Sequence, residues 1–542
     1  MDSFSVSGTI IDVVNSRFYK GTLHITNGVI TNITEHEDVA DVFIMPGFTD
    51  AHVHIESSML VPSEFARLAT LHGTITVVSD PHEIANVAGV EGVRFMVENG
   101  LQSPLKFSFG APSCVPATPF ESAGSSISVD DINYLFSNGL ANHLSEMMNF
   151  PGVLQKDSQV MEKLGLAKKF KFPADGHAPG LLGSEAGAYA EAGISTDHEC
   201  FTLQEAYDKI DAGMHILIRE GSAAKNFNAL IDLLRTHPEK LMFCSDDLHA
   251  DDLAKGHINL LVKRALDAGY DIFDVLRACT LNPTKHYMTG AGLVQKGDAA
   301  DFVVVDNLSD FNILQTYING KAVSQQGKSL IDPVAVRGPQ NFFTNKISPE
   351  ILQIQASGST MRVIQVFDGQ LITKEMLTSP KVENGFVVPD VDRDLALLVV
   401  VNRYNEAAPS KAFVHGFGLK DGALASSVAH DSHNIIAVGT SAELIEKAIG
   451  LIQEHRGGIA VVKGNNEHVL PLPVGGLMAE QDAFLVAKQL DVLQKMAIET
   501  GSTLHSPFMT LSFLSLLVIP HIKLSDKGLF NGDTFKFVPL FE

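Results

Sequence analysis

Short apolar runs alternate with stretches of helical periodicity through the middle of the chain. Eight apolar runs read as buried strands, at residues 43–54, 74–80, 105–110, 140–146, 170–177, 192–198, 214–219 and 241–246. Helical patterns separate them, for example at residues 63–71, 83–99, 130–137, 201–212 and 223–236. Eight strand–helix units in roughly 240 residues predict an α/β fold with a (β/α)8 TIM-like barrel. A doubly wound open sheet is the alternative, but no Gly-x-Gly-x-x-Gly follows the first strand.

The segments on either side of the barrel have a different pattern. β-type runs lie at residues 5–14 and 21–33 and again at 298–306 and 313–323. They predict a small flanking β-sandwich domain built from both ends, residues 1–44 plus 290–345, beside a barrel domain over residues 45–289. Between residues 346 and 542, strand-like runs lie at residues 361–367, 395–402, 412–417, 435–438 and 459–462. They alternate with two helical stretches, residues 442–455 and 481–500, which predicts a C-terminal α+β domain.

Composition and charge narrow the function classes. A chain of 542 residues has room for several domains, and its formal charge of −23 disfavours nucleic acid or an anionic membrane as partner. A small neutral or cationic substrate is compatible with that charge. The four cysteines include no Cys-x-x-Cys, the start lacks a signal-peptide pattern, and the apolar run 508–519 is too short to span a bilayer. These features predict a cytoplasmic protein.

A pair of histidines follows the first barrel strand. His52 and His54 are two residues apart, so on a strand they share one face and can hold one ion. Two histidines on a solvated strand face are the alternative. The apolar lead-in, residues 43–45, favours burial.

The carboxyl ends of barrel strands meet at one mouth, and here almost all of them carry ionisable residues. A helix cap explains a single polar strand end but not so many. Six of these residues are candidate metal ligands: His52, His54, Glu146, His177, His198 and Asp246. Four imidazoles and two carboxylates suit two divalent ions, with Glu146 bridging them. Such a pair would supply hydroxide near neutral pH, and Asp246 would be both ligand and proton acceptor. Without thiolates, iron, manganese and zinc all remain possible.

Several motifs resemble those of the bacterial adenine deaminases, within the amidohydrolase superfamily. The matching segments are residues 51–59, 80–83, 147–152, 176–180 and 196–199, and the resemblance runs on into the C-terminal part at residues 428–434, so it covers nearly the whole chain. The resemblance implies hydrolytic deamination of adenine to hypoxanthine and ammonia in purine salvage, by a metal-bound hydroxide. It also implies Mn(II) or Fe(II) in preference to Zn(II), a homo-oligomer, and Glu146 in the place where many relatives use a carboxylated lysine.

The other residues at the barrel mouth have several possible roles. The resemblance favours Glu199 as the acid that protonates N1 of adenine, with Glu220, paired with Arg219, in reserve. Asp80 and His82 would relay protons to the departing ammonia, hold substrate, or form a capped turn. Further candidates for contact with the purine edge are Gly180, Arg219 and Ser222.

The C-terminal motif adds a third imidazole-rich segment. His430, Asp431 and His433 could reach the barrel mouth, bind a further metal, or make a hydrogen-bonded turn. We expect this segment to cover the mouth, in its own subunit or a neighbour's, and His433 to contact substrate.

Two other functions remain open. One is another amidohydrolase activity, on a different aminopurine or a cyclic amide, and the other is a barrel that has lost catalysis. The zinc deaminases with a Pro-Cys-x-x-Cys motif are excluded, because the chain has no such motif.

Overall fold

The computed structural model describes residues 3–343 and 346–542. At its centre lies a ring of parallel strands: β5 (Phe48–Val53), β6 (Thr74–Ser79), β7 (Lys106–Ala111), β8 (His143–Met147), β9 (Ala174–Gly176), β10 (Thr196–Asp197), β11 (His215–Arg219) and β12 (Leu241–Cys244). Parallel bridges from Ala174 to Ile194 and from Val53 to Asp246 join the two ladders into a closed barrel. The predicted barrel is confirmed. β6, for example, is buried along its whole length, as a parallel strand covered on both faces should be.

Helices surround the barrel and follow its strands in sequence. They are α1 (Pro62–Ala69), α2 (His82–Gly100), α3 (Val129–Ser137), α4 (Phe150–Leu154), α5 (Ser158–Phe170), α6 (Gly183–Glu191), α7 (Leu203–Asp211), α8 (Phe227–Leu230), α9 (Ala250–Leu253), α10 (Ile258–Asp267), α11 (Ile272–Ala278) and α12 (Leu281–Tyr287). Side-chain caps define where several of them begin. Ser128 and Asp131, for instance, form a reciprocal capping box at the start of α3. None of the helices among the described residues is long and apolar enough to cross a bilayer.

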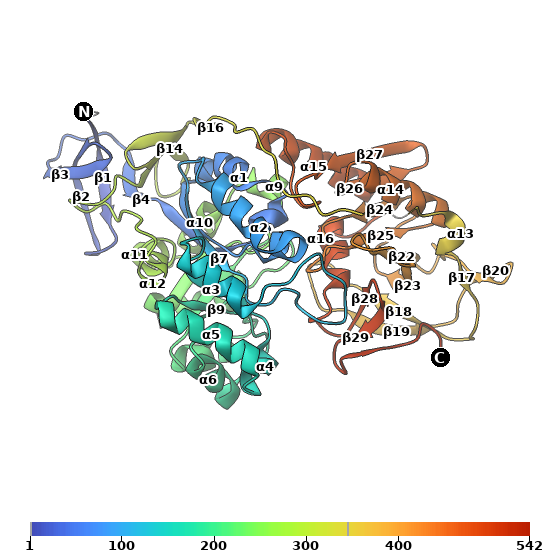
Figure 1. Ribbon diagram of the computed structural model, residues 1–542. Coiled ribbons are helices and arrows are strands. Elements are labelled where there is room, and N and C mark those ends of the chain that lie inside the picture. The colour runs from blue at the N-terminus through green and yellow to red at the C-terminus, as the bar shows by residue number, and fades with distance from the viewer. Residues whose placement is uncertain (1–2, 344–345) are drawn as a thin grey trace.

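Strands from both flanks of the barrel join in one continuous sheet beside it (Figure 1). In spatial order they are β16 (Lys328–Ser329), β15 (Lys321–Gln325), β14 (Ile313–Ile318), β13 (Phe302–Val305), β4 (Phe43–Pro46), β1 (Ser3–Asp12), β2 (Arg17–Thr26) and β3 (Val29–Glu35). β4 pairs with β1 in parallel and with β13 in antiparallel register, so it links the two flanks. Apolar side chains of both halves share one core, which includes Ile10 and Phe302.

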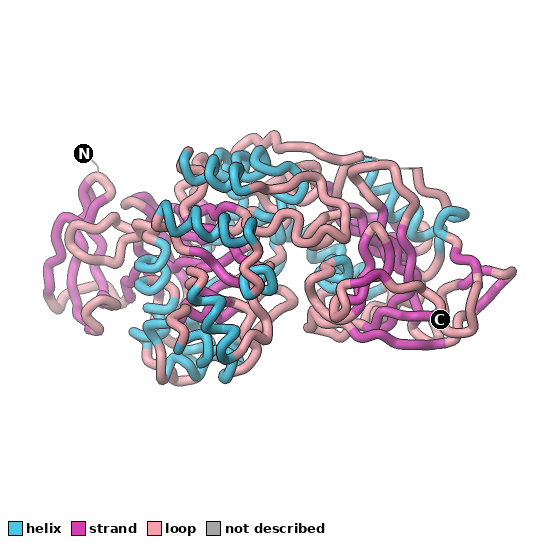
Figure 2. The backbone as a smooth tube through the Cα atoms, turned by 60° about the horizontal axis from the view of Figure 1, so that its bottom comes forward, coloured by secondary structure: helices cyan, strands magenta, loops and turns pink. Residues whose placement is uncertain are grey.

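The C-terminal part is built on a second eight-stranded sheet. Its strands are β19 (Lys374–Thr378), β18 (Met361–Gln365), β23 (Ser410–His415), β22 (Leu395–Val401), β25 (Ile435–Gly439), β24 (Ala423–Ser426), β26 (Gly458–Lys463) and β27 (Asn466–Pro471). Two three-stranded sheets accompany it, β17 (Ile354–Gln355) with β21 (Phe386–Val387) and β20 (Val382–Glu383), and β28 (Ile522–Ser525) with β29 (Gly528–Asn531) and β30 (Lys536–Phe537). The helices are α13 (Pro349–Leu352), α14 (Ala442–Glu454), α15 (Ala483–Glu499) and α16 (Pro507–Ser512). Figure 2 shows strands gathered at both ends of the molecule and helices around the strands between them.

The C-terminal part is fastened directly to the barrel. α15 packs on α1 and α9, and residues of both parts, such as Phe65 and Leu490, belong to one apolar cluster. Polar contacts at the start of α15 support this packing. Asp482 caps α15 and pairs with Arg67 of α1 at 2.6 Å, while Glu64 accepts a hydrogen bond from the Ala483 amide at 2.8 Å. This packing holds the C-terminal part over one end of the barrel.

Candidate active site

The six candidate ligands lie together at the carboxyl end of the barrel. Glu146, from the end of β8, is central: its Oε2 lies 2.8 Å from His177 Nδ1 and 3.0 Å from His198 Nε2. Its Oε1 lies 3.6 Å from His54 Nε2. One carboxylate oxygen therefore faces one group of imidazoles and the other oxygen faces another, which is the arrangement that a bridging ligand requires.

His52, His54 and Asp246 complete the other side of the cluster. The Nε2 atoms of His52 and His54 are 3.2 Å apart, and His54 Nε2 is 3.3 Å from Asp246 Oδ1. His54 Nδ1 lies 3.1 Å from the carbonyl oxygen of Asp80. Because a carbonyl only accepts, Nδ1 carries the proton, and the lone pair on Nε2 faces the cluster. That tautomer is the one a metal ligand needs, so the donor set fits divalent metal ions.

Electrostatics keep the carboxylates of the cluster charged. Burial alone would raise the pKa of Glu146, but His177 and His198 outweigh it and hold that pKa well below the ordinary value. For Asp246, burial is outweighed first by Arg219 and then by hydrogen bonds from His52 and His54, so its pKa is also held well below the ordinary value. Both side chains are therefore anionic at neutral pH.

Arg219 connects two of the carboxylates. Its Nη1 donates to Asp246 Oδ2 at 2.6 Å and to Glu199 Oε1, and its Nη2 donates to Glu199 Oε2 at 2.9 Å. The arginine is only 1% exposed. It thus holds the candidate proton acceptor and the candidate N1 acid in fixed orientations.

The expected pairing of Arg219 with Glu220 is not what the structure shows. Arg219 is the last residue of β11, and neighbouring side chains on a strand point to opposite faces, so Glu220 turns away from the barrel mouth. Glu220 Oε2 pairs with Arg264 Nη1 at 2.8 Å, outside the pocket. This placement removes Glu220 as a reserve acid.

Two other residues predicted to contact substrate also form their hydrogen bonds outside the pocket. Ser222 Oγ donates to Asp252 at 2.7 Å and accepts from the His249 amide at 3.0 Å. The Gly180 amide donates to Glu205 at 2.7 Å. Neither residue is among those that line the pocket, because both help to fold the loops behind it.

Asp80 and His82 stand beside the ligand cluster. His82 Nδ1 lies 3.2 Å from Asp80 Oδ2 and 3.5 Å from Glu146 Oε1. Asp80 Oδ1 also accepts from the His82 amide at 3.0 Å, so the aspartate both shapes the turn into α2 and faces the imidazole. His82 lines the pocket, and Asp80 lies behind it.

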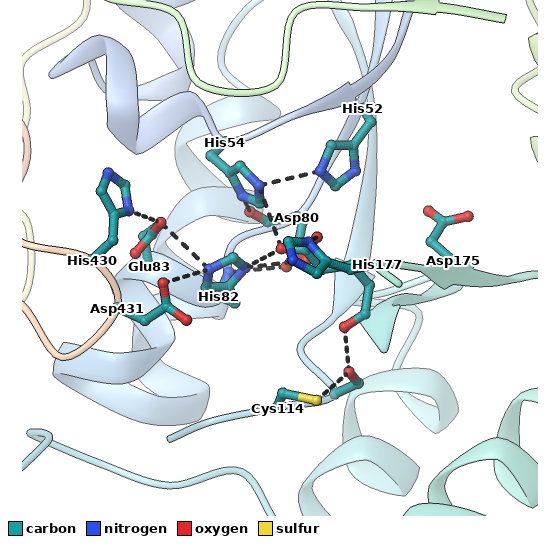
Figure 3. A network of polar contacts seen from close by, with 12 residues as sticks. His52, His54, Asp80, His82, Glu83, Cys114, Asp175, His177, His430 and Asp431 are labelled. Atoms are coloured by element: carbon teal, nitrogen blue, oxygen red, sulfur yellow. Dashed lines mark hydrogen bonds and ion pairs between the residues drawn. The ribbon is translucent and has the colours of Figure 1, made fainter. Parts of the chain in front are cut away.

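Glu83 was not among the predicted site residues, yet it joins the barrel to the C-terminal part. One of its oxygens bonds to His430 Nδ1 (Figure 3), and the other bonds to His433 Nε2. A glutamate at the start of a helix is ordinarily explained by its favourable interaction with the helix dipole. The acidic residue beside His82 in Asp-Pro-His-Glu was the available signal, but its partners lie 347 and 350 residues away in the sequence.

The C-terminal part therefore covers the barrel mouth within the same chain. Its contribution to the pocket includes an apolar wall of Leu371, Phe513, Leu516 and Ile519, beside His430 and Asp431. His433 itself does not line the pocket; it reaches Glu83 from behind. The pocket is narrow: the cavity that these residues line has a volume of about 30 Å³.

Comparison with known proteins agrees with this arrangement. Residues 43–323 match the amidohydrolase family, and residues 370–536 match the adenine deaminase C-terminal domain. The chain is 49% identical to an adenine deaminase of Salinibacter ruber, over 99% of each chain. It is 48% identical to one of Methanosarcina barkeri, over 98% of each, and 42% identical to one of Borreliella burgdorferi, over 99% of this chain and all of that one. The chain belongs to the adenine deaminase family of amidohydrolases.

Proposed function

We propose that this protein hydrolyses adenine to hypoxanthine and ammonia, in purine salvage. The observation that carries the proposal is the cluster of four imidazoles and two carboxylates, centred on Glu146, beneath a narrow pocket. Full-length similarity to adenine deaminases supports adenine as the substrate.

Two divalent metal ions are proposed for the cluster, held by His52, His54, Glu146, His177, His198 and Asp246. When bound, such ions act as Lewis acids and lower the pKa of water at the reacting carbon. Imidazole and carboxylate ligands without thiolate suit Mn(II), Fe(II) or Zn(II), and the family resemblance favours the first two. Elemental analysis of protein from defined medium tests this: fewer than about one metal per chain at full activity would contradict two ions.

The carboxylates of the chain are placed to move protons. Asp246, oriented by Arg219, takes the proton of the attacking water. Glu199 lines the pocket and is the proposed donor to N1; because it is paired with Arg219, the proton that it donates is one released by the attacking water. His82 lies between the carboxylates of Asp80 and Glu83, where it can hold and release the proton that the departing ammonia requires.

The deciding experiment measures adenine consumption and ammonia release by the purified protein with manganese or iron supplied. A panel of other aminopurines and cyclic amides separates this activity from those of other amidohydrolases. The Glu146→Gln variant is the control for contaminating activity. No turnover of adenine under these conditions would refute the proposal.

We also propose that the molecule has three domains, with boundaries near residues 45, 290 and 346, and that it assembles as a homo-oligomer. The two large, mostly antiparallel sheets on either side of the barrel support the division. Limited proteolysis should cut near these boundaries, and light scattering should give a mass above that of the 58.4 kDa chain.

A further inference from the structure

The imidazole of His430 is held rigidly at the wall of the pocket. Its ring stacks on Phe513, with centroids 4.5 Å apart and planes inclined by 13°. Its backbone amide donates to the Ser512 carbonyl at 3.1 Å, and its backbone carbonyl accepts from Ser515 Oγ at 3.1 Å. Glu83 binds its Nδ1. A side chain fixed on so many sides presents its remaining polar atom in one direction.

That remaining atom, Nε2, has no hydrogen-bond partner in the part of the chain that the structure describes. His430 is only 2% exposed and lines the pocket together with Glu83, Asp431 and Phe513. Buried polar atoms in native proteins almost always have a partner. A partner from outside the chain, bound in the pocket, would complete the hydrogen bonding of Nε2.

A metal ion held by Glu83, His430 and His433 is the competing explanation, since these three residues lie close together. The Ala429 amide donates to His433 Nδ1 at 3.2 Å, so Nδ1 offers its lone pair and Nε2 carries the proton. A protonated Nε2 donates to Glu83 and cannot ligate a metal. Burial lowers the pKa of His433, which agrees with a neutral ring that donates through Nε2. The cluster is therefore a hydrogen-bonded support for His430.

The position of His430 indicates which edge of a purine it meets. His430, Glu83 and Asp431 lie on the opposite side of His82 from His177 and His52 (Figure 3). The reacting C6 of adenine must face the ligand cluster, so the N3 side of the ring points away from it. We propose that His430 Nε2 donates a hydrogen bond to N3 of adenine and thereby sets the orientation of the base. This inference rests on the proposed function.

Charge supports His430 as a donor. The carboxylates of Glu83, Asp247 and Asp431 face it, and although burial lowers its pKa, Glu83 outweighs that effect and raises the pKa to about 9. The ring is then an imidazolium near neutral pH, with a proton on Nε2 as well as on Nδ1. N3 of adenine has a lone pair and no proton, so the two atoms are complementary.

The test compares adenine with 3-deazaadenine, which has a CH group in place of N3. The variants are His430→Asn, whose amide replaces Nδ1 and keeps the bond to Glu83, and His430→Gln, whose amide replaces Nε2. We expect the native protein to prefer adenine by at least about tenfold in kcat/KM. The Asn variant should lose about that factor with adenine but little with 3-deazaadenine, and the Gln variant should recover part of the preference. Intrinsic differences between the two bases cancel in this cycle.

Other outcomes overturn the inference. An Asn variant that loses the same factor with both bases would show that His430 is only structural. A preference for adenine over 9-methyladenine, which keeps N3 but lacks N9–H, that disappears in the His430→Asn variant would show that the ring accepts from N9–H instead. If the native protein turns over no adenine, the proposed function fails. Calorimetric binding of adenine and 3-deazaadenine to the native protein then still tests the contact, and equal affinities would refute it. Metal content and circular dichroism confirm that each variant is folded.

Discussion

Replacing Arg219 by methionine tests the electrostatic design of the site. Methionine keeps much of the aliphatic volume but removes the three hydrogen bonds to Asp246 and Glu199. Two carboxylates that are at most 4% exposed are then left without their cation. Breaking one buried ion pair costs about 3–5 kcal/mol, so we expect at least a loss of that size in the free energy of unfolding.

Arg264→Met is the matched control. Arg264 also pairs with a glutamate, Glu220, and also lies over a phenylalanine ring, as Arg219 does. Its side chain is 41% exposed, however, and an exposed pair is worth only about 0–1 kcal/mol. Because the chain has no tryptophan, unfolding in urea is followed by circular dichroism. The loss of stability in Arg219→Met should be larger in protein from which a chelator has removed the metal, because bound metal ions would partly neutralise Asp246.

The same variant should change the pH dependence of activity. Arg219 is the largest of the effects that lower the pKa of Asp246, so its removal raises that pKa. Asp246 accepts a proton only when ionised, and the acid limb of kcat/KM should therefore move to higher pH. The stability advantage of the native protein should be complete above the unfolded pKa of aspartate, about 3.9, and should decline as pH falls through the lower folded pKa. If Arg219→Met is no less stable than Arg264→Met and its acid limb does not move, the reasoning is wrong.

Three further substitutions test individual roles. Asp246→Asn should keep most of the metal, by elemental analysis, but lower kcat by roughly 10²–10⁴-fold, since the proton acceptor is lost; a loss below tenfold would assign that role to another residue. Glu146→Gln should lose metal on dialysis because a bridging ligand needs both carboxylate oxygens, and native metal content would contradict the bridge. His433→Ala should lower kcat/KM for adenine severalfold, because Glu83 loses one of its two imidazole donors. His468→Ala, at an exposed position on β27 of the C-terminal sheet, should have no effect, and equal kinetics for the two variants would make His433 purely structural.

The barrel could be predicted because its signals are local. Each of the eight apolar runs overlaps one of the strands β5 to β12, since a parallel strand buried on both faces needs a continuous apolar run. The barrel topology then brings the strand ends to one mouth, so six residues spread between His52 and Asp246 could be grouped before any contact was known. In the C-terminal part, β22 and the helices α14 and α15 were predicted, but β24 was missed, because Ala423–Ser426 is too short to show a pattern.

The directions of individual side chains, and the way the C-terminal part docks on the barrel, could be known only from the tertiary structure. The motif Arg219-Glu220 allowed either side chain to face the mouth, and only the register of β11 decided in favour of Arg219. The sequence placed His433 in contact with substrate, whereas the structure places His430 at the pocket and His433 behind Glu83.

The sequence by itself thus determined the strands, the barrel and the ligands at its mouth, because periodicity and strand ends are properties of neighbouring residues. Which C-terminal residues cover the pocket was decided only by how the C-terminal part docks on the barrel. Glu83 meets His430 and His433 because α15 packs on α1 and α9, and Phe513 lies over the mouth for the same reason. Such contacts join residues far apart in the chain, and an apolar face has the same local pattern whichever surface it packs against.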